Sequence, residues 1–250
     1  MDEKRNCVLS IAGFDPSGGA GILADIKTFE RHRVYGVSAI SSVTFQNDIE
    51  FNSIQWINAD DIIKQVSLLR KRFEFPIIKI GLIKDLESLE KIINYLTSSI
   101  SNPIIIWDPI IKASAGFEFH NKFQNKDLLA IIKNIFLITP NIEEIKFITN
   151  INAPEKAAKE LSRYCNVLLK GGHNETEPGT DYLYIKNNVE KILPSKENVF
   201  PKHGSGCVLS SAIAANLALG FDLLTSCYNA KIYVETFLSS NRSLIGEHYV

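Results

Sequence analysis

The chain has 250 residues, of which 45% are hydrophobic and 22% are charged, and its formal net charge is −1 at pH 7. These values are ordinary for a globular protein and exclude collagenous and low-complexity classes. Proteins that bind nucleic acids or anionic membrane surfaces carry basic excesses or basic segments, so the balanced charge argues against both. We expect a single domain over residues 1–250, because this length is routine for one α/β domain.

Short runs rich in β-branched residues alternate with amphipathic segments. Several of the runs are apolar nearly throughout, as expected of parallel strands that are covered on both faces. They predict strands at residues 7–12, 37–45, 76–80, 103–107, 135–139 and 167–170. The amphipathic segments predict helices at residues 21–32, 60–72, 86–99, 126–133 and 154–164. This alternation predicts an α/β fold with a mostly parallel central sheet and helices on both faces.

The pattern changes after Gly171. Residues 181–186 and 189–193 flank Asn187-Asn188, which predicts a β-hairpin with a tight turn. Two closing helices are expected at about residues 206–219 and 223–239. The run 204–221 has no Lys, Arg, Asp or Glu and is long enough to raise the question of a membrane helix. Its serines, asparagine and small residues favour a buried helix of a soluble protein.

The cysteines form neither a C-x-x-C pair nor a Cys/His cluster typical of zinc sites. A core of this size needs no disulfides, so reduced thiols are expected. The acidic pair near the N-terminus makes a poor secretory signal, and we expect the protein in the cytoplasm. The four thiols are those of Cys7, Cys165, Cys207 and Cys227.

The first predicted strand leads into a glycine-rich segment, residues 12–21, with the sequence AGFDPSGGAG. Its glycines permit positive φ and let the backbone come close to a ligand, while the following helix offers unpaired N–H groups. The segment is neither a Walker A loop nor a G-x-G-x-x-G fingerprint. A tight strand–helix turn is the simpler interpretation, but the density of glycines favours a ligand loop. Open α/β sheets bind ligands at such positions, beyond the carboxyl ends of the strands.

A second glycine-rich segment, residues 203–207 (HGSGC), opens the apolar run 204–221. Glycines at a helix N-terminus form an anion site from backbone N–H groups and the helix dipole. The charge that develops in phosphoryl transfer is a suitable guest. Cys207 lies in the first turn, where the dipole favours the thiolate, so we expect an acidic thiol. The alternative is a small buried residue at a packing contact.

Two further strand ends carry residues that suit a nucleotide site. Asn141 and Glu144 are three residues apart and share one helix face; they are also typical of a helix cap with favourable first-turn charge. Near a nucleotide, a carboxylate is what hydrated Mg²⁺ uses. Lys170 can meet phosphate oxygens as a point charge, with a solvated surface lysine as the alternative. Asp108 also ends a strand, where an acid is often a turn former.

Gln46 ends the second predicted strand. Its amide carries both a donor and acceptor, so it can pair at two points with a ring nitrogen and an adjacent amine, as Gln does with adenine. The alternative is a polar loop residue. Taken alone, the position favours the polar loop residue.

In this order the motifs resemble those of the ribokinase-like small-molecule kinases, and within them the hydroxymethylpyrimidine and phosphomethylpyrimidine kinases of thiamin biosynthesis. The resemblance spans nearly the whole chain, and the opening and closing glycine segments together make it specific. It is carried by residues 12–21 with Ala24-Asp25, and by residues 35–38, 44–47, 79–82, 139–144, 168–173 and 203–207.

The resemblance implies a three-layer ribokinase-like fold, a homodimer, and Mg²⁺- and ATP-dependent phosphorylation of 4-amino-5-hydroxymethyl-2-methylpyrimidine and then of its monophosphate. It assigns the pyrimidine pocket to Gly13, Ala20, Asp25, Gln46 and Leu82. It assigns the anion hole to Gly204, Ser205, Gly206 and Cys207, with Cys207 in the place of the catalytic base. It assigns the nucleotide side to Lys170, Asn141 and Glu144, with Glu144 reaching the metal through water.

The chain departs from the family pattern at several positions. Family members often have Ser or Thr at Phe14, Met at Leu82, Thr at Lys202 and Thr at Ser205. Ser205 keeps the hydroxyl of the usual Thr, and Leu82 keeps about the volume of the usual Met. Phe14 and Lys202, in contrast, change the pocket shape and the local charge. Residues 112–119 also differ from the common pattern, and no role is assigned to them.

Two alternatives to this function remain. A pyridoxal or pyridoxine kinase of the same fold also phosphorylates a hydroxymethyl group on a nitrogen heterocycle, but Gln46 favours an aminopyrimidine. A non-catalytic pyrimidine sensor would keep the pocket without the chemistry. The intact Gly-Ser-Gly-Cys segment and the Asn141/Glu144 pair argue against the sensor, because lost catalysis should free those positions.

Overall fold

The computed structural model describes residues 5–112, 116–119, 125–172, 176–186, 188–196 and 198–248. The strands are β1 (Cys7–Phe14), β2 (Tyr35–Gln46), β3 (Phe51–Trp56), β4 (Ile77–Ile80), β5 (Ile104–Trp107), β6 (Leu137–Ile138), β7 (Asn166–Leu169), β8 (Asp181–Ile185) and β9 (Asn188–Ile192). The helices are α1 (Gly21–Arg31), α2 (Ala59–Arg70), α3 (Leu86–Ser99), α4 (Asn125–Ile132), α5 (Ile142–Thr149), α6 (Pro154–Leu161), α7 (Ser205–Ala218) and α8 (Leu223–Ser239).

In the described part of the chain the strands form one 9-stranded sheet in the order β3-β2-β1-β4-β5-β6-β7-β8-β9. Strands β2, β1, β4, β5, β6 and β7 are parallel, whereas β3, β8 and β9 pair antiparallel at the two edges. The central strands are short and apolar because helices cover both of their faces. The expectation of a mostly parallel sheet is confirmed.

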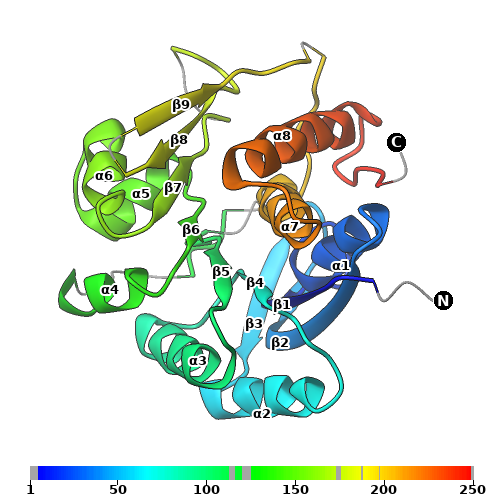
Figure 1. Cartoon of the computed structure of the whole chain (residues 1–250). Coiled ribbons are helices and arrows are strands. Elements are labelled where there is room, and N and C mark those ends of the chain that lie inside the picture. The colour runs from blue at the N-terminus through cyan, green and yellow to red at the C-terminus, as the bar shows by residue number, and fades with distance from the viewer. Residues whose placement is uncertain are drawn as a thin grey trace.

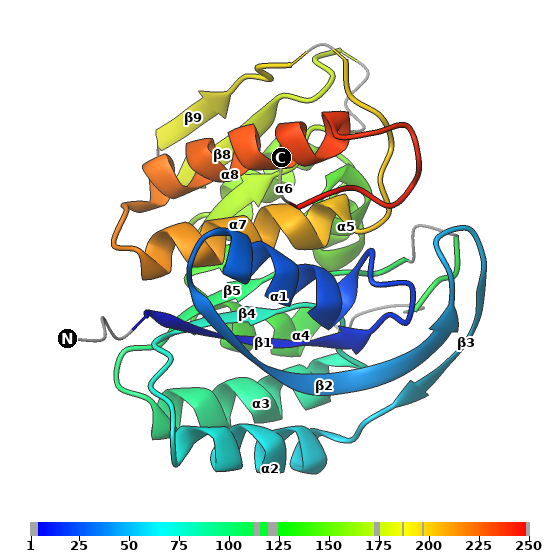
Figure 2. The ribbon, with the colours of Figure 1, turned by 90° about the vertical axis from the view of Figure 1, so that its right-hand side faces the viewer.

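Helices lie on both faces of the sheet and make a three-layer α/β fold (Figures 1 and 2). One layer holds α2, α3, α4, α5 and α6, whose buried side chains pack with one face of the strands. The other holds α1, α7 and α8. The apolar run that opens at residue 204 forms α7, which is buried along nearly its whole length. Within the described residues, no helix is both long and apolar enough to cross a membrane.

The hairpin after residue 171 is confirmed: β8 and β9 pair from Asp181↔Ile192 to Ile185↔Asn188. Residue 187 of the expected turn lies outside the described residues, as do His173 and residues 113–115 of the unassigned loop. The four cysteines, all of them among the described residues, form no disulfide with one another.

Two elements were not among the predicted strands and helices. Strand β3 pairs with β2 at the sheet edge, and its side chains are half-buried or exposed, so it lacks the apolar run that marks the central strands. Helix α5 begins at Ile142, within the segment 139–144. Its N-cap is Asn141, which accepts a hydrogen bond from the backbone N–H of Glu144, while the Glu144 carboxylate accepts one from the N–H of Asn141. The capping interpretation of these two residues is therefore confirmed.

Candidate active site

The carboxyl ends of the parallel strands converge on one edge of the sheet, as the fold class requires. Most residues singled out from the sequence lie at that edge or just beyond it. Gln46 ends β2, Gly81-Leu82 follows β4, Asp108 follows β5, Thr139 follows β6, and Lys170 follows β7.

The two glycine-rich segments interlock. Gly204, the N-cap of α7, has φ +76°, a left-handed conformation that favours glycine. A Cβ at this position would lie 2.1 Å from the backbone oxygen of Gly19 and 2.7 Å from Cα of Ala20. The turn before α1 and the loop that opens α7 are thus in direct backbone contact. We call residues 204–207 the anion loop.

A buried hydrogen bond joins the same two segments through side chains. Nε2 of His203 lies 2.9 Å from Oδ2 of Asp15. Asp15 also accepts from the N–H and hydroxyl of Ser17 and from the N–H of Ala20. Burial raises the pKa of Asp15, but the hydrogen bonds from His203, Ser17 and Ala20 outweigh it and hold that pKa below its ordinary value. The aspartate is therefore ionised at neutral pH and organises the glycine-rich turn.

Lys170 lies beside the anion loop. A Cβ built on Gly206 would be 3.3 Å from its Nζ and 3.8 Å from Oδ2 of Asp108. The Lys170 ammonium is 2.9 Å from Oδ1 of Asp108 and 3.5 Å from Oε2 of Glu144. Thr139 also donates to Asp108. These contacts place one largely buried ammonium between two buried carboxylates at the edge of the anion loop.

The pKa values of Asp108 and Glu144 shift in opposite directions. Burial raises the pKa of Asp108, but nearby Lys170 and Lys79 and the hydrogen bonds from Lys170 and Thr139 outweigh it and lower that pKa overall. Burial raises the pKa of Glu144 to about 7, since Lys170 is farther away and the charge of Asp108 adds to the rise. Glu144 consequently changes its charge near neutral pH, while Asp108 stays ionised.

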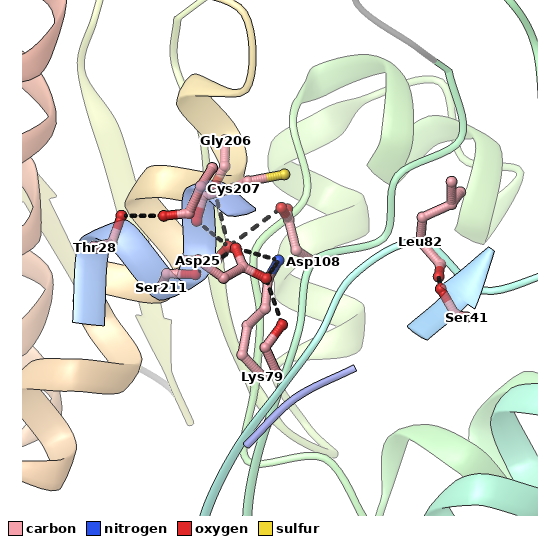
Figure 3. Close-up of polar contacts among 12 residues, drawn as sticks. Asp25, Thr28, Ser41, Lys79, Leu82, Asp108, Gly206, Cys207 and Ser211 are labelled. Carbon is pink, nitrogen blue, oxygen red and sulfur yellow. Dashed lines mark hydrogen bonds and ion pairs between the residues drawn. The ribbon is translucent and has the colours of Figure 1, made fainter. Parts of the chain in front are cut away.

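A second buried charge pair lies beneath the start of α7 (Figure 3). Lys79 and Asp25 are both 0% exposed, with Nζ 3.0 and 2.9 Å from the two carboxylate oxygens. Ser10 and Ser211 also donate to Asp25. These four hydrogen bonds fill the acceptor positions of the carboxylate. Asp25 is thus fully buried and holds Lys79 in place, and its carboxylate has no acceptor position left for another donor in this structure.

The expectation of an acidic Cys207 is wrong. The side chain is buried, and burial raises the pKa of the thiol to about 11, although Lys79 and the backbone N–H of Gly21 act in the opposite direction. The helix dipole cannot offset the loss of hydration at this depth. Cys207 is a neutral thiol at the end of the anion loop.

Among the expected pocket residues, Gly13 and Leu82 are neighbours. A Cβ on Gly13 would lie 3.5 Å from Cδ2 of Leu82 and 2.7 Å from Oγ of Ser42. Ala20 adjoins the anion loop through Gly204. Gln46 is half-buried, and its amide makes no hydrogen bond to another described residue. The structure brings Gly13, Ala20 and Leu82 to the two loops, and Gln46 lies at the end of the edge-side strand β2.

Three features of the site were not assigned from the sequence: the central position of Asp108, the pairing of Lys79 with Asp25, and the pairing of His203 with Asp15. In the sequence Asp108 is an acid at the end of a predicted strand, but an acid at such a position is often part of a turn, so no site role was assigned to it. Its partner Lys170 is 62 residues away in the chain. Proximity in the fold, and not local sequence, assigns these roles.

The donor set suits a metal that keeps most of its water. In the described ranges no group of three or more His, Cys, Asp or Glu side chains could hold a metal ion. Glu144 and Asp108 are hard oxygen ligands next to the anion loop, and Mg²⁺ is commonly held by one or two carboxylates with substrate phosphates and waters. The residues present therefore fit Mg²⁺ bound with a nucleotide.

Comparison with solved structures identifies the fold. A *Staphylococcus aureus* pyridoxal kinase in complex with AMP-PCP and pyridoxal superimposes with a TM-score of 0.84 at 21% sequence identity, covering 98% of this chain and 94% of that one. At this identity the likeness shows the fold, which is ribokinase-like.

Sequence comparison identifies the family within this fold. The family model described as phosphomethylpyrimidine kinase matches residues 15–249, and the chain belongs to this family of kinases. A hydroxymethylpyrimidine/phosphomethylpyrimidine kinase from *Aquifex aeolicus* is 32% identical over 250 residues, covering 96% of this chain and 97% of the relative. The crystal structure of a phosphomethylpyrimidine kinase from *Clostridium difficile* 630 has a TM-score of 0.77 at 31% identity, covering 92% of this chain and 98% of that one.

Proposed function

We propose that the protein transfers the γ-phosphoryl group of ATP to the hydroxymethyl oxygen of 4-amino-5-hydroxymethyl-2-methylpyrimidine, and then phosphorylates the resulting monophosphate, in thiamin biosynthesis. The observation that carries this proposal is the contact of the anion loop with the glycine-rich turn on one side and with Lys170 on the other, in a chain of this family. The nucleotide complexes of pyridoxal kinases with this fold support ATP as the donor.

The substrate pocket is proposed to lie around Gly13, Ala20 and Leu82, with Gln46 reading the pyrimidine. Ser42 and Leu82 pack directly against the backbone of Gly13, and Leu82 supplies an apolar wall. The Gln46 amide is available for a two-point contact with the exocyclic amine and the adjacent ring nitrogen. Asp25 supports this pocket from beneath through Lys79.

Phosphoryl transfer is proposed to occur over the anion loop. A bond forms between the hydroxymethyl oxygen and the γ-phosphorus, the bond to the β–γ bridging oxygen breaks, and the hydroxyl proton leaves to solvent. The N–H groups of residues 204–207 stabilise the charge in transit, and Lys170 neutralises phosphate oxygens. Asn141 caps helix α5 and accepts a hydrogen bond from the backbone N–H of Glu144. Glu144 would hold Mg²⁺ through water, and the bound ion would neutralise further phosphate charge. Cys207, neutral at physiological pH, positions the hydroxyl.

The remaining proposals concern the whole chain. One continuous sheet supports a single domain, and the balanced charge supports small-molecule substrates in place of nucleic acids or membranes. Free thiols support the cytoplasm. A homodimer follows from the resemblance to family members, and sedimentation of the purified chain tests it.

A pyridoxal or pyridoxine kinase is the second candidate, because pyridoxal kinases share this fold. Gln46 favours the aminopyrimidine, since its amide serves an amine and a ring nitrogen together. The deciding experiment incubates the protein with Mg-ATP and each of hydroxymethylpyrimidine, its monophosphate, pyridoxal and pyridoxine, and measures ADP. We expect the highest kcat/KM with the two pyrimidines. A higher kcat/KM for pyridoxal would overturn the assignment, and tight pyrimidine binding without turnover would indicate a sensor.

A further inference from the structure

Lys202 is a buried lysine that the proposed reaction does not use. It lies two residues before the anion loop, and it is 6% exposed. Its Nζ donates to the backbone oxygen and the Oδ1 of Asn241, the latter at 3.0 Å, and to the backbone oxygen of Ser243 at 2.6 Å. We call these three acceptors the oxygen cage. Within the described residues no carboxylate lies within ion-pairing distance of this ammonium.

The cage belongs to a loop that packs behind the anion loop. Residues 241–245 form this C-terminal loop, which in Figure 2 turns back from the end of α8 toward α7. The N–H of His203 donates to the backbone oxygen of Leu244 at 2.8 Å. A Cβ on Gly19 would lie 2.6 Å from Cδ2 of His203 and 2.9 Å from Cδ1 of Ile245. The C-terminal loop, His203 and the glycine-rich turn therefore form one packed stack.

The chemistry of the cage is that of a monovalent cation site. A buried ammonium must recover its lost hydration from polar partners. Here all three partners are neutral oxygens, and neutral carbonyl oxygens are also the groups that replace the hydration shell of K⁺ in selective channels. The chain thus carries its own cation at a place where free K⁺ or NH₄⁺ finds suitable ligands.

We propose that Lys202 is a positioning residue for phosphoryl transfer, whose ammonium fills the oxygen cage as a built-in monovalent cation and fixes the C-terminal loop against His203 and the anion loop. The inference rests on the proposed kinase reaction. Removing the ammonium leaves the anion-loop N–H groups in the chain but frees the loop that packs behind them. Small displacements of positioning groups lower catalysis by up to about 10²-fold, so the effect should fall on kcat.

The test uses Lys202→Ala in buffers whose only added monovalent cation is tetramethylammonium, K⁺ or NH₄⁺. In tetramethylammonium, which is too large for the cage, we expect kcat to drop at least about tenfold with KM for the pyrimidine nearly unchanged. K⁺ or NH₄⁺ should restore kcat along a saturable curve, and should raise the Tm of the variant more than that of wild type. Lys196→Ala is the matched control, because this lysine is exposed and its ammonium donates to Ser239 on α8, away from the oxygen cage; its kcat should match wild type in every salt.

A second variant, Lys202→Met, retains a long side chain without the charge and should show the same loss with weaker rescue, because the side chain obstructs the cage. A Lys202→Ala enzyme with wild-type kcat in tetramethylammonium would overturn the proposal. A variant whose kcat and Tm are lowered, and are restored by no cation beyond its effect on wild type, would also overturn it. Failure of both variants to fold in every salt would overturn it as well, since the lysine would then serve folding alone. The Tm measurements detect cation binding to the cage even if pyrimidines prove not to be substrates. They therefore test the role of Lys202 separately from the proposed kinase reaction.

Discussion

Lys170 and Asp108 form a largely buried ion pair, with 2.9 Å between Nζ and Oδ1, directly beside the anion loop. The pair joins the ends of two strands, β5 and β7, that are not neighbours in the sheet. The Lys170 ammonium lies closer to Asp108 than to Glu144, whose Oε2 is 3.5 Å away. Burial therefore raises the pKa of Glu144 to about 7, because the more distant ammonium offsets only part of the effect. This division of charge gives the site a titration near neutral pH.

The first prediction concerns the pH dependence of stability. Unfolded Glu144 loses its proton near pH 4.5 and the folded group near 7, so the folded state binds more protons between these values. The stability contributed by protonated Glu144 is full below pH 4.5 and is lost as pH rises through 7. Glu144→Gln keeps the cap and removes the titration, so the Tm difference between variant and wild type should shift in favour of the variant from pH 5 to pH 8.

Glu143→Gln is the control for this series, because Glu143 is the preceding residue of α5 and its side chain is 77% exposed. Its Tm should follow that of wild type across the same range. Parallel curves for wild type and Glu144→Gln would show that Glu144 titrates outside this window.

The second prediction concerns Cys207. A buried thiol whose pKa is about 11 should react with iodoacetamide more slowly than the half-buried Cys7 at pH 7.5. Cys207→Ala should lower kcat by less than the roughly 10²–10⁴-fold expected for loss of a general base, because a neutral thiol only positions the hydroxyl. Cys227→Ala, which removes a buried thiol of α8, is the control. A loss within the general-base range, with a pH limb that disappears in the variant, would assign proton transfer to Cys207.

The third prediction concerns Gln46. Gln46→Leu removes both polar groups at nearly constant volume, which should leave the amine and ring nitrogen of the pyrimidine without partners, at about 1–3 kcal/mol for each group. kcat/KM for hydroxymethylpyrimidine should fall accordingly, while KM for ATP stays nearly constant. Gln55→Leu changes an exposed glutamine on the neighbouring strand β3 and should leave both parameters unchanged. Unaltered pyrimidine kinetics in Gln46→Leu would remove this residue from the pocket.

The fourth prediction concerns the buried pair beneath α7. Lys79→Met leaves the Asp25 carboxylate in the core without its cation and should lower the free energy of unfolding by about 3–5 kcal/mol. The double variant Lys79→Met with Asp25→Asn should recover part of this loss, because no unpaired charge remains. Urea unfolding of wild type, both single variants and the double variant measures the coupling. Additive losses would mean that the two groups do not interact in the folded protein.

The layers of the fold could be predicted from the sequence because the central strands are apolar runs and the helices are amphipathic. Strand β3 was missed, since an edge strand with Asn52, Ser53 and Gln55 exposed has no such run. The capping role of Asn141 and Glu144 was visible locally because both partners lie within one helical turn.

The interior of the site could not be predicted in the same way. The raised pKa of Cys207 depends on how deeply α7 is buried, and the filled acceptor positions of Asp25 depend on Lys79 and Ser211, which lie far away in the chain. A helix N-terminus predicts an acidic thiol only when water still reaches it. Local sequence predicted which residues gather at the site, and long-range packing decides their charge.

The backbone contact between residues 19 and 204 has a consequence for how the enzyme is made. On the ribosome the glycine-rich turn emerges early, and residues 202–207 follow only after nearly the whole sheet has been synthesised. Because Gly204 lies against the backbone oxygen of Gly19, and His203 bonds to Asp15 across 188 positions, the anion loop can take this shape only after residues 203–207 have been synthesised. A nascent chain that has not reached these residues therefore lacks the contact that shapes the proposed phosphate site, and we expect no catalytic activity from it.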